Sequence, residues 1–351
     1  MTKEERVIAA LNLQPTDRTP AYDLIRNDDL IQHYTGSVPP IGDEGLRAVC
    51  KTTAACLDMT RSLRSPGEET EQVDKHGIVW GFERWTRWII RRPFEDLTGT
   101  TDYIERKVDD FNNEDIAAMA DQIAADFNKR RNYLGDDTVI LLRDSGTGLD
   151  WLREELGWEL FSYATVDAPD HISAYLEAYT NREIKLIDEL VQKIWSPCAL
   201  TYGDIAYKGA LLHSPAWLRR EFFPRLKRLN EAYHKHNVKC LFHSDGYLMD
   251  VMPDLIESGI DGLNPVETLA GMNLAEIKKL YGDKLFITGA IDVSQLLPYA
   301  SVDEVVKVCE ESIRAASPGF FIGSSTELGN GVKLENILAM FKAAGAIEYY
   351  E

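Results

Sequence analysis

The sequence has few positive charges for its size. Its 351 residues include 38 Lys and Arg against 57 Asp and Glu, which gives a formal net charge of −19. A surface with that balance repels phosphate backbones and anionic lipids, so it argues against nucleic-acid binding and membrane binding. The excess of acidic residues is a property of the whole chain, so a basic pocket could still exist at one place on the surface.

Cysteines and long apolar runs are also scarce. The five cysteines are scattered, odd in number and never spaced as CxxC, which argues against a disulfide scaffold and predicts a reducing environment. No stretch approaches the roughly 18 apolar residues that indicate a transmembrane helix. Residues 1–19 have no apolar signal-peptide core and indicate an amphipathic helix instead. We therefore expect a cytoplasmic protein.

Several common catalytic motifs are missing. The sequence has no GxGxxG followed by an acid, no Walker loop, no GxSxG elbow and no HExxH. Nucleotide binding and the common hydrolase chemistries therefore lack support from local motifs.

What the sequence does contain is an alternation of short β-branched or aromatic runs with amphipathic stretches. Such an alternation predicts βαβ units and a parallel sheet, and barrels of this kind often exceed the usual size of a single domain. We predict one α/β domain over residues 1–351, a (β/α)8 TIM barrel with an N-terminal helix in 1–19 and an inserted Trp-rich hairpin at 73–90. The expected strands are 21–25, 138–142, 199–202, 238–242, 262–264, 285–288 and 320–322, and the expected helices are 113–132, 169–193, 215–236, 274–281, 302–316 and 334–344.

Polar residues follow several of the expected strands, where the active sites of parallel barrels lie. Any one of them has a simpler explanation, because Asp245 and Asp292 are also suited to cap the helices that follow. Acidic or imidazole groups at successive strand ends would instead converge on one barrel mouth. The group comprises Asp204, His243, Asp245, Glu267, Asp292, Ser324, Ser325 and Glu327.

The sharpest local feature is His243-Ser244-Asp245-Gly246. Residues i and i+2 of an extended segment face the same side, so His243 and Asp245 can point at one place. Such a pair suits a divalent metal or an acid/base couple. The alternative is a structural histidine that is hydrogen-bonded to a neighbouring carbonyl.

A family resemblance covers residues 198–345. The segments FHSDGYLMDVMPDLIESGIDGLNPVETL, LFITGAIDVSQLL, PGFFIGSSTEL and LENILAMFKAAG resemble the uroporphyrinogen decarboxylase (URO-D) superfamily. That resemblance implies a (β/α)8 barrel. Authentic decarboxylases carry two arginines after the first strand, and here Arg26 fits the first while Leu30 occupies the second. The chain therefore resembles the corrinoid-dependent methyltransferase branch more closely.

In that branch, the resemblance implies zinc held by a His-x-Cys motif and a late cysteine. His243 matches the histidine, Asp245 stands at the first cysteine, and Glu327 lies near the second, so we expect these three as metal ligands. We expect Asp204, His243 and Asp245 to be catalytic. The residues expected to contact substrate are Arg26, Tyr202, Glu267, Asp292 and Ser325.

Three functions follow as hypotheses. The first is methyl transfer between a small methyl donor and a corrinoid carried by a small partner protein, and the superfamily also suggests a homodimer. The second is a cofactor-free decarboxylase of uroporphyrinogen or a smaller carboxylic acid, with Arg26 holding a carboxylate. The third is a non-catalytic barrel that binds a small molecule, because a fold alone does not establish chemistry.

Overall fold

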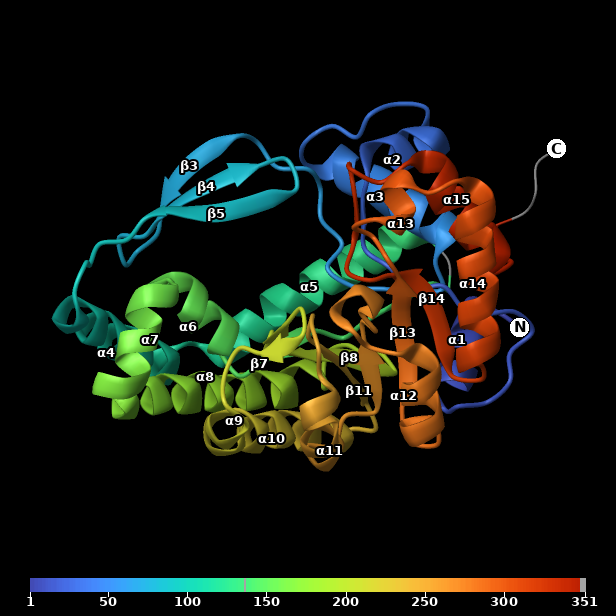
Figure 1. Ribbon diagram of the computed structural model, residues 1–351. Coiled ribbons are helices and arrows are strands. Elements are labelled where there is room, and N and C mark those ends of the chain that lie inside the picture. Colours follow the sequence, from blue (N-terminus) through green and yellow to red (C-terminus); the bar gives the residue numbers. More distant parts are fainter. Residues whose placement is uncertain (136, 348–351) are drawn as a thin grey trace.

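A computed structural model describes residues 1–135 and 137–347 (Figure 1). The described part of the chain contains eight parallel runs of strand that follow one another around a barrel. In chain order they are β1 (Ile25–Arg26) with the bridged residues just before it, β2 (Met59–Thr60), β6 (Val139–Ile140) continuing into β7 (Asp144–Gly146), β8 (Cys198–Tyr202), β11 (Lys239–His243), β12 (Gly262–Asn264), β13 (Phe286–Ile291) and β14 (Phe320–Ser324). This confirms the predicted (β/α)8 fold.

Hydrogen bonds close the strands into a ring. Six strands form one sheet in the order β14-β13-β12-β11-β8-β7, and β2 pairs with β6. Two parallel bridges complete the circle, Ala21 with Ile322 and Tyr22 with Met59. Strand β14 passes so close to the first strand that a Cβ on Gly323 would lie 1.9 Å from the Tyr22 carbonyl oxygen. The closing seam therefore requires glycine at this position.

Helices and short loops surround the barrel (Figure 1). Side chains cap several of these helices, and at the start of α14 Ser301 and Glu304 form a capping box. The helical segments are α1 (Lys3–Leu11), α2 (Asp28–Thr35), α3 (Asp43–Cys56), α4 (Leu97–Asn113), α5 (Ile116–Leu134), α6 (Leu149–Leu156), α7 (Trp158–Asp167), α8 (Pro169–Leu190), α9 (Pro215–Glu221), α10 (Phe223–His234), η1 (Met249–Val251), α11 (Met252–Glu257), η2 (Thr268–Ala270), α12 (Leu274–Tyr281), α13 (Leu296–Tyr299), α14 (Val302–Ala316) and α15 (Leu334–Ala343).

Two expected helices differ from the structure. The helix expected within 1–19 ends at Leu11, and Leu13 adopts a positive φ of 59° that no regular helix allows. The helix expected over 215–236 is divided at Phe222 into α9 and α10. Pro224, in the first turn of α10, has no backbone N–H to continue the hydrogen bonds of α9, which explains the break.

The inserted segment is larger than the predicted hairpin. Three antiparallel strands, β3 (Thr70–Val73), β4 (Val79–Glu83) and β5 (Thr86–Arg91), form a separate sheet that stands away from the barrel in Figure 1. Arg84 and Trp85, in the turn between β4 and β5, both donate hydrogen bonds to Asp28 at the start of α2. These contacts fix the tip of the sheet to the barrel side of the molecule. Strands β9 (Ala206–Tyr207), β10 (Ala210–Leu211) and β15 (Leu328–Gly329) are short additions.

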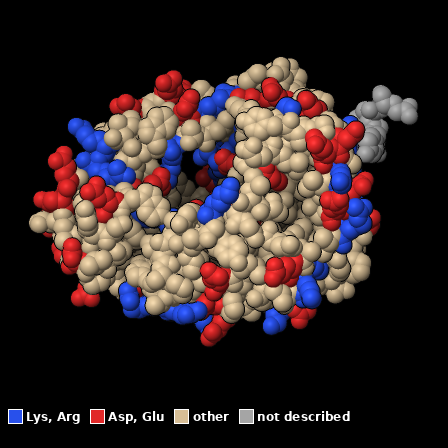
Figure 2. All heavy atoms as spheres, in the orientation of Figure 1, with Lys and Arg blue, Asp and Glu red and all other residues tan. Residues whose placement is uncertain are grey.

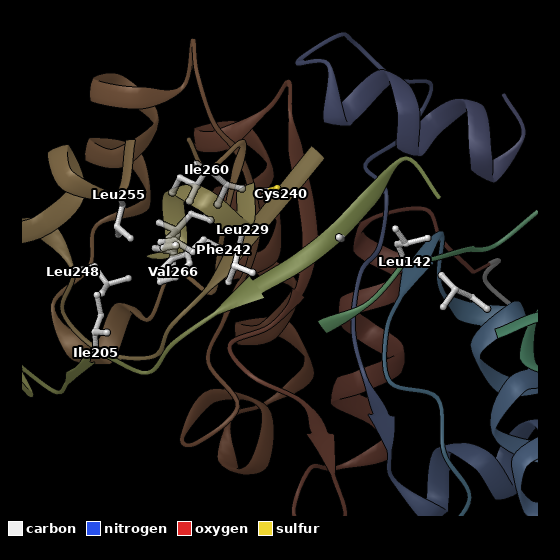
Figure 3. Close-up of a cluster of buried hydrophobic side chains, with 14 of the residues drawn as sticks. Leu142, Ile205, Leu229, Cys240, Phe242, Leu248, Leu255, Ile260 and Val266 are labelled. Atoms are coloured by element: carbon white, nitrogen blue, oxygen red, sulfur yellow. The ribbon is translucent and has the colours of Figure 1, made fainter. Parts of the chain in front are cut away.

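Alternation along β11 decides which side chains face the barrel interior. Cys240 and Phe242 pack outward against Leu229 of α10, within the cluster of buried side chains in Figure 3. Leu241 belongs to a second buried cluster, which fills the interior and includes Val7 and Leu11 of α1. His243 comes two residues after Leu241, so its side chain also points to the barrel interior, at the carboxyl end of the strand. The core therefore sets the direction of this imidazole.

Candidate functional site

The candidate site lies at the carboxyl ends of β8 and β11. These parallel strands pair in register, with Tyr202 opposite His243, and Asp204 and Asp245 each follow two residues later. Ligand atoms of Asp204, His243 and Asp245 all lie within 4.8 Å of one another. The His243 Nε2 to Asp204 Oδ1 distance is 3.9 Å. We call these three residues the mouth triad.

Neighbouring strands fix the orientation of His243. The Asn264 Nδ2 atom donates to Thr288 Oγ1 at 2.6 Å, so the Asn264 Oδ1 atom is the acceptor that meets His243 Nδ1 at 2.7 Å. The proton of the neutral imidazole is therefore on Nδ1, and Nε2 presents its lone pair to Asp204. Metal-ligating histidines in proteins are commonly held in this way through their second nitrogen.

Asp245 carries a buried oxygen that no group satisfies. Within the described part of the chain, its Oδ1 atom has no hydrogen-bond partner. Burial raises the pKa of Asp245 to about 6, the charges of Asp204 and Glu267 add to this effect, and the charge of His243 opposes it. A buried carboxylate without partners is costly, so this oxygen is a point where a bound cation would be stabilised.

The turn after Asp245 is tightly built. Gly246 has a φ of +94°, and a Cβ there would lie 2.6 Å from backbone atoms of Ala206 and Tyr207. Its N–H donates to Glu267 Oε2 at 2.7 Å. Glu267 therefore fixes the turn that carries Asp245 and adds negative charge beside it, which places it next to the mouth triad as expected.

The mouth triad fits a divalent cation. One imidazole nitrogen and two carboxylates form a donor set that zinc accepts, and catalytic zinc sites use three protein ligands with one open position. In the Nδ1–H tautomer that Asn264 favours, the Nε2 atom of His243 carries a lone pair that a cation can accept. The Oδ1 atom of Asp245 has no hydrogen-bond partner in the described part of the chain, so it can bind a cation without losing another contact.

A cavity of about 610 Å³ lies beside the mouth triad, and we call it the mouth cavity. Its basic groups are neutralised, since Lys107 lies 2.8 Å from Glu155 and Arg61 lies 2.9 Å from Asp144. Burial and the charge of Asp204 raise the pKa of Asp150 to about 6. The lining residues are Arg61, Lys107, Phe111, Arg143, Asp144, Asp150, Trp151, Glu155, Tyr175, Tyr179, Arg182, Leu200, Tyr202, Asp204 and His243. Aromatic rings and paired charges thus surround the space that faces His243.

Tyr202 lies on the wall of this cavity. Its hydroxyl accepts a hydrogen bond from Trp151 Nε1 at 3.0 Å. Its ring packs on Gly146, where a Cβ would lie 2.8 Å from the ring. These contacts hold Tyr202 rigidly beside His243.

The expected ligand set requires one correction. The structure does not bring Glu327 into the mouth triad, because its Oε2 atom forms an ion pair with Arg26 Nη1 at 2.6 Å. Asp204, rather than Glu327, is the carboxylate whose oxygen lies within 4.8 Å of the ligand atoms of His243 and Asp245. The same ion pair neutralises the charge of Arg26, the residue expected to hold a substrate carboxylate. The sequence correctly predicts that Glu327 lies at the carboxyl end of the barrel strands. It does not predict that the Glu327 side chain points toward Arg26.

Two further expected contacts have structural roles. Asp292 accepts from the N–H groups of Gln295 and Leu296 and from the Ser294 hydroxyl, so it caps α13. Burial opposes its ionisation, but these hydrogen bonds outweigh burial and lower the pKa of Asp292. The Ser325 hydroxyl accepts from the Val293 N–H at 3.2 Å. The capping alternative therefore describes Asp292, and neither residue lines the mouth cavity.

Sequence reasoning missed several residues of the mouth cavity. Arg143 and Asp144 directly follow the expected strand 138–142, and the rule that identified the other polar residues would have found them. Arg61 follows β2, whose two residues are too few to produce a recognisable strand pattern. Asp150 lies in the first turn of α6, where only the fold brings it to the barrel mouth.

A second potential metal-binding group consists of His234, Cys240 and Asp261, near the start of β11. Its carboxylate is already used, since Asp261 Oδ2 contacts His234 Nε2 at 2.7 Å and accepts from the Cys240 N–H at 2.8 Å. Burial raises the pKa of the Cys240 thiol well above its usual range, so the thiolate needed for a metal is disfavoured. The mouth triad is the better candidate.

Comparison with known proteins supports the family resemblance. A family model described as uroporphyrinogen decarboxylase (URO-D) matches residues 159–347, which is more than half of the chain. The protein therefore belongs to the URO-D family. No curated protein matches the chain.

Two solved structures are similar to this chain. A methyltransferase from Methanosarcina mazei is 16% identical, with a TM-score of 0.71 over 98% of both chains. A B12-independent methionine synthase from a Shewanella species is 10% identical, with a TM-score of 0.49 over 94% of this chain and 96% of the other. The first likeness shows a shared fold over the whole length. Among the described residues, no helix is long and apolar enough to cross a membrane.

Proposed function

We propose that the protein is a metal-assisted methyltransferase that moves a methyl group between a small methyl donor and a corrinoid carried by a separate small protein. The observation that carries the proposal is the mouth triad, with an available Nε2 lone pair and an unpartnered carboxylate oxygen. Membership of the URO-D family is compatible with it, because the methyltransferase branch that the chain resembles uses zinc and a corrinoid partner.

His243, Asp204 and Asp245 would hold the zinc ion. When bound, zinc would act as a Lewis acid toward a substrate atom in its open position. One nitrogen and two oxygens form a harder donor set than the nitrogen and two sulfurs of thiol-alkylating relatives. We therefore favour a donor whose methyl group is attached to oxygen.

The surrounding residues would bind and protonate the donor. Tyr202 and Trp151 provide an aromatic wall that orients a small molecule next to His243. The reduced corrinoid of the partner protein would supply the electron pair for the new bond to the methyl carbon. The bond from the methyl carbon to the donor oxygen would then break with its electron pair left on oxygen, and that oxygen needs a proton. Asp150 is a suitable source because its pKa is about 6 and it lines the same cavity.

The partner would dock over the barrel mouth, where the cavity lies. We propose the cytoplasm as the location, and the five cysteines, all free and buried, suit a reducing compartment.

Metal content is the direct test. Protein purified without chelator should contain about one equivalent of zinc by elemental analysis. His243→Ala should lose it, whereas the control His236→Ala should keep it, because His236 is a surface imidazole 3.2 Å from Asp188. Metal-free wild-type protein that also fails to bind added zinc would contradict the proposal.

A cofactor-free decarboxylase is the second candidate. It is favoured by two carboxyl groups at the mouth, Asp150 and Asp245, whose raised pKa values suit proton transfer near neutral pH. Metal-free protein that releases CO2 from a carboxylated pyrrole would support this candidate over methyl transfer. Metal-free protein without either activity would leave a non-catalytic binding barrel.

A further inference from the structure

A second cavity, of about 460 Å³, lies beside α5 and the loop that follows β2. Four guanidinium groups line it, those of Arg26, Arg64, Arg130 and Arg143. We call it the arginine cavity. It shares Arg143 and Asp144 with the mouth cavity but does not include the mouth triad. Figure 2 shows a hollow near the middle of the molecule that is bordered by Lys and Arg atoms and by some Asp and Glu atoms.

The four arginines differ in what they contact. Arg26 and Arg143 are ion-paired, with Glu327 at 2.6 Å and with buried Glu183 at 3.0 Å. Arg64 instead donates to a backbone carbonyl, that of Trp85 in the three-stranded sheet. Among the described residues, no carboxylate lies within ion-pair distance of Arg64.

Arg130 resembles Arg64. Its Nε atom donates to the Leu63 carbonyl at 2.8 Å, and its nearest carboxylate, Asp126, lies 3.8 Å away and is 56% exposed. An exposed pair at that distance contributes little. Arg64 and Arg130 are therefore each held in place by a backbone carbonyl, that of Trp85 and that of Leu63. In the described part of the chain, the exposed Asp126 at 3.8 Å from Arg130 is the one carboxylate within ion-pair distance of either guanidinium group.

The electrostatics of this region differ from those of the whole chain. Burial lowers the pKa of Arg26 to about 10, and the positive charges of Arg64 and Arg61 add to this effect against the opposing charge of Glu327. Burial also lowers the pKa of Arg64, the charge of Glu327 opposes this effect, and the charge of Arg87 adds to it. Several positive charges thus lie close enough to repel one another in a protein whose net charge is −19.

We propose that the arginine cavity binds an oxyanion group of a small ligand, a carboxylate or a phosphate, between Arg64 and Arg130. Guanidinium groups donate paired N–H bonds to both kinds of oxyanion, and carbonyl contacts preorganise the donors. Ser62 lines the same cavity with a φ of 50°, and its hydroxyl donates to Asp144 Oδ2 at 2.5 Å, so the wall beside Arg64 is rigid. The site requires no metal.

Calorimetric titration with inorganic phosphate and with succinate tests the proposal and distinguishes the two sources of the oxyanion. At least one of them should bind saturably to wild-type protein and raise its melting temperature. Arg64→Gln and Arg130→Gln should each weaken binding by about tenfold or more, because each removes charged hydrogen bonds. Arg64→Lys, which keeps the charge, should bind with intermediate affinity.

The matched control is Arg314→Gln, since Arg314 is 67% exposed and pairs only with Glu310 on its own helix in the described structure. It should bind the anion as the wild type does. Failure of both anions to bind wild-type protein, or wild-type affinity in both Gln variants, would overturn the proposal. Zinc content measured on the same samples separates this result from the proposed function, because the arginine variants leave the mouth triad intact.

Discussion

His243 is held through Nδ1 by Asn264, which is held in turn by Thr288. Because the three residues lie on the consecutive strands β11, β12 and β13, the sheet itself sets the tautomer of the imidazole. A metal site built in this way depends on Asn264 as well as on its direct ligands.

Replacing Asn264 tests that dependence. Asn264→Ala should weaken zinc binding by about tenfold to 100-fold, because Nε2 would no longer be fixed as the lone-pair nitrogen. Asn264→Asp retains an acceptor for Nδ1–H and should recover most of the affinity. Competition with a chromophoric chelator measures both, with the surface variant Asn113→Ala as the control. Unchanged affinity in Asn264→Ala would show that the hydrogen bond has no role.

Asp23 provides a pH-dependent prediction away from the metal site. Burial raises its pKa to about 7, against the opposing hydrogen bonds from Ser324 and the Leu24 N–H. Its folded pKa thus exceeds the unfolded value of about 4. The contribution to stability is therefore complete below about pH 4 and is lost as pH rises through 7.

Urea unfolding of wild type and Asp23→Asn should reveal this loss. The stability of the wild type relative to the variant should fall by about 1.4 kcal/mol per pH unit between roughly pH 5 and 7. Any hydrogen bond lost in the variant shifts the difference at every pH equally, so the slope is the informative quantity. A difference that does not change with pH would mean that Asp23 ionises normally.

Among the elements, the seam between β14 and the first strand has the least room. Gly323→Ala should destabilise the protein by about 3 kcal/mol, because its Cβ would overlap the Tyr22 carbonyl and neither strand can move alone. Gly329→Ala is a matched control in β15, since nothing lies within 4 Å of its Cβ position. Equal stability of the two variants by urea unfolding would contradict the tight seam.

The same elements show how far the sequence predicts the fold. Strand 262–264 and helices 274–281 and 302–316 coincide with β12, α12 and α14. The two helices begin at side-chain caps, Asn273 and Ser301, so local information suffices for them. Strand β2 was missed because Met59 and Thr60 form a strand only through pairing with β6. The hairpin at 73–90 likewise lacked β3, whose exposed residues carry no apolar alternation.

The candidate site also contains residues that the sequence predicts and contacts that it does not predict. Asp204, His243 and Asp245 were predictable because each lies within two residues of a strand end, where parallel register brings neighbours together. Glu327 was expected in the ligand set, and the sequence does not reveal that its carboxylate pairs with Arg26, 301 positions away. Long-range pairing of charges requires the fold, whereas proximity at strand ends does not.

For the whole molecule, the mouth triad predicts stabilisation by metal. Zinc at about 100 times its dissociation constant should stabilise the wild type by about 2.7 kcal/mol, which corresponds to a rise of a few degrees in melting temperature. His243→Ala should show no such rise. Differential scanning calorimetry of protein stripped of metal, with and without added zinc, measures the difference. A rise of equal size in both proteins would place the stabilising ion elsewhere.

The seam between β14 and the first strand also limits which fragments of the chain could fold by themselves. The residues matched by the family model, 159–347, contain β8 and β11 to β14 but neither β7 nor the strands that bridge to β14. A fragment limited to that range would expose two bare sheet edges, with unpaired N–H and C=O groups available to other copies. During synthesis, the growing polypeptide meets the same hazard until Phe320–Ser324 has emerged to join Ala21. The range that the family model matches is therefore shorter than the range that the barrel needs in order to close.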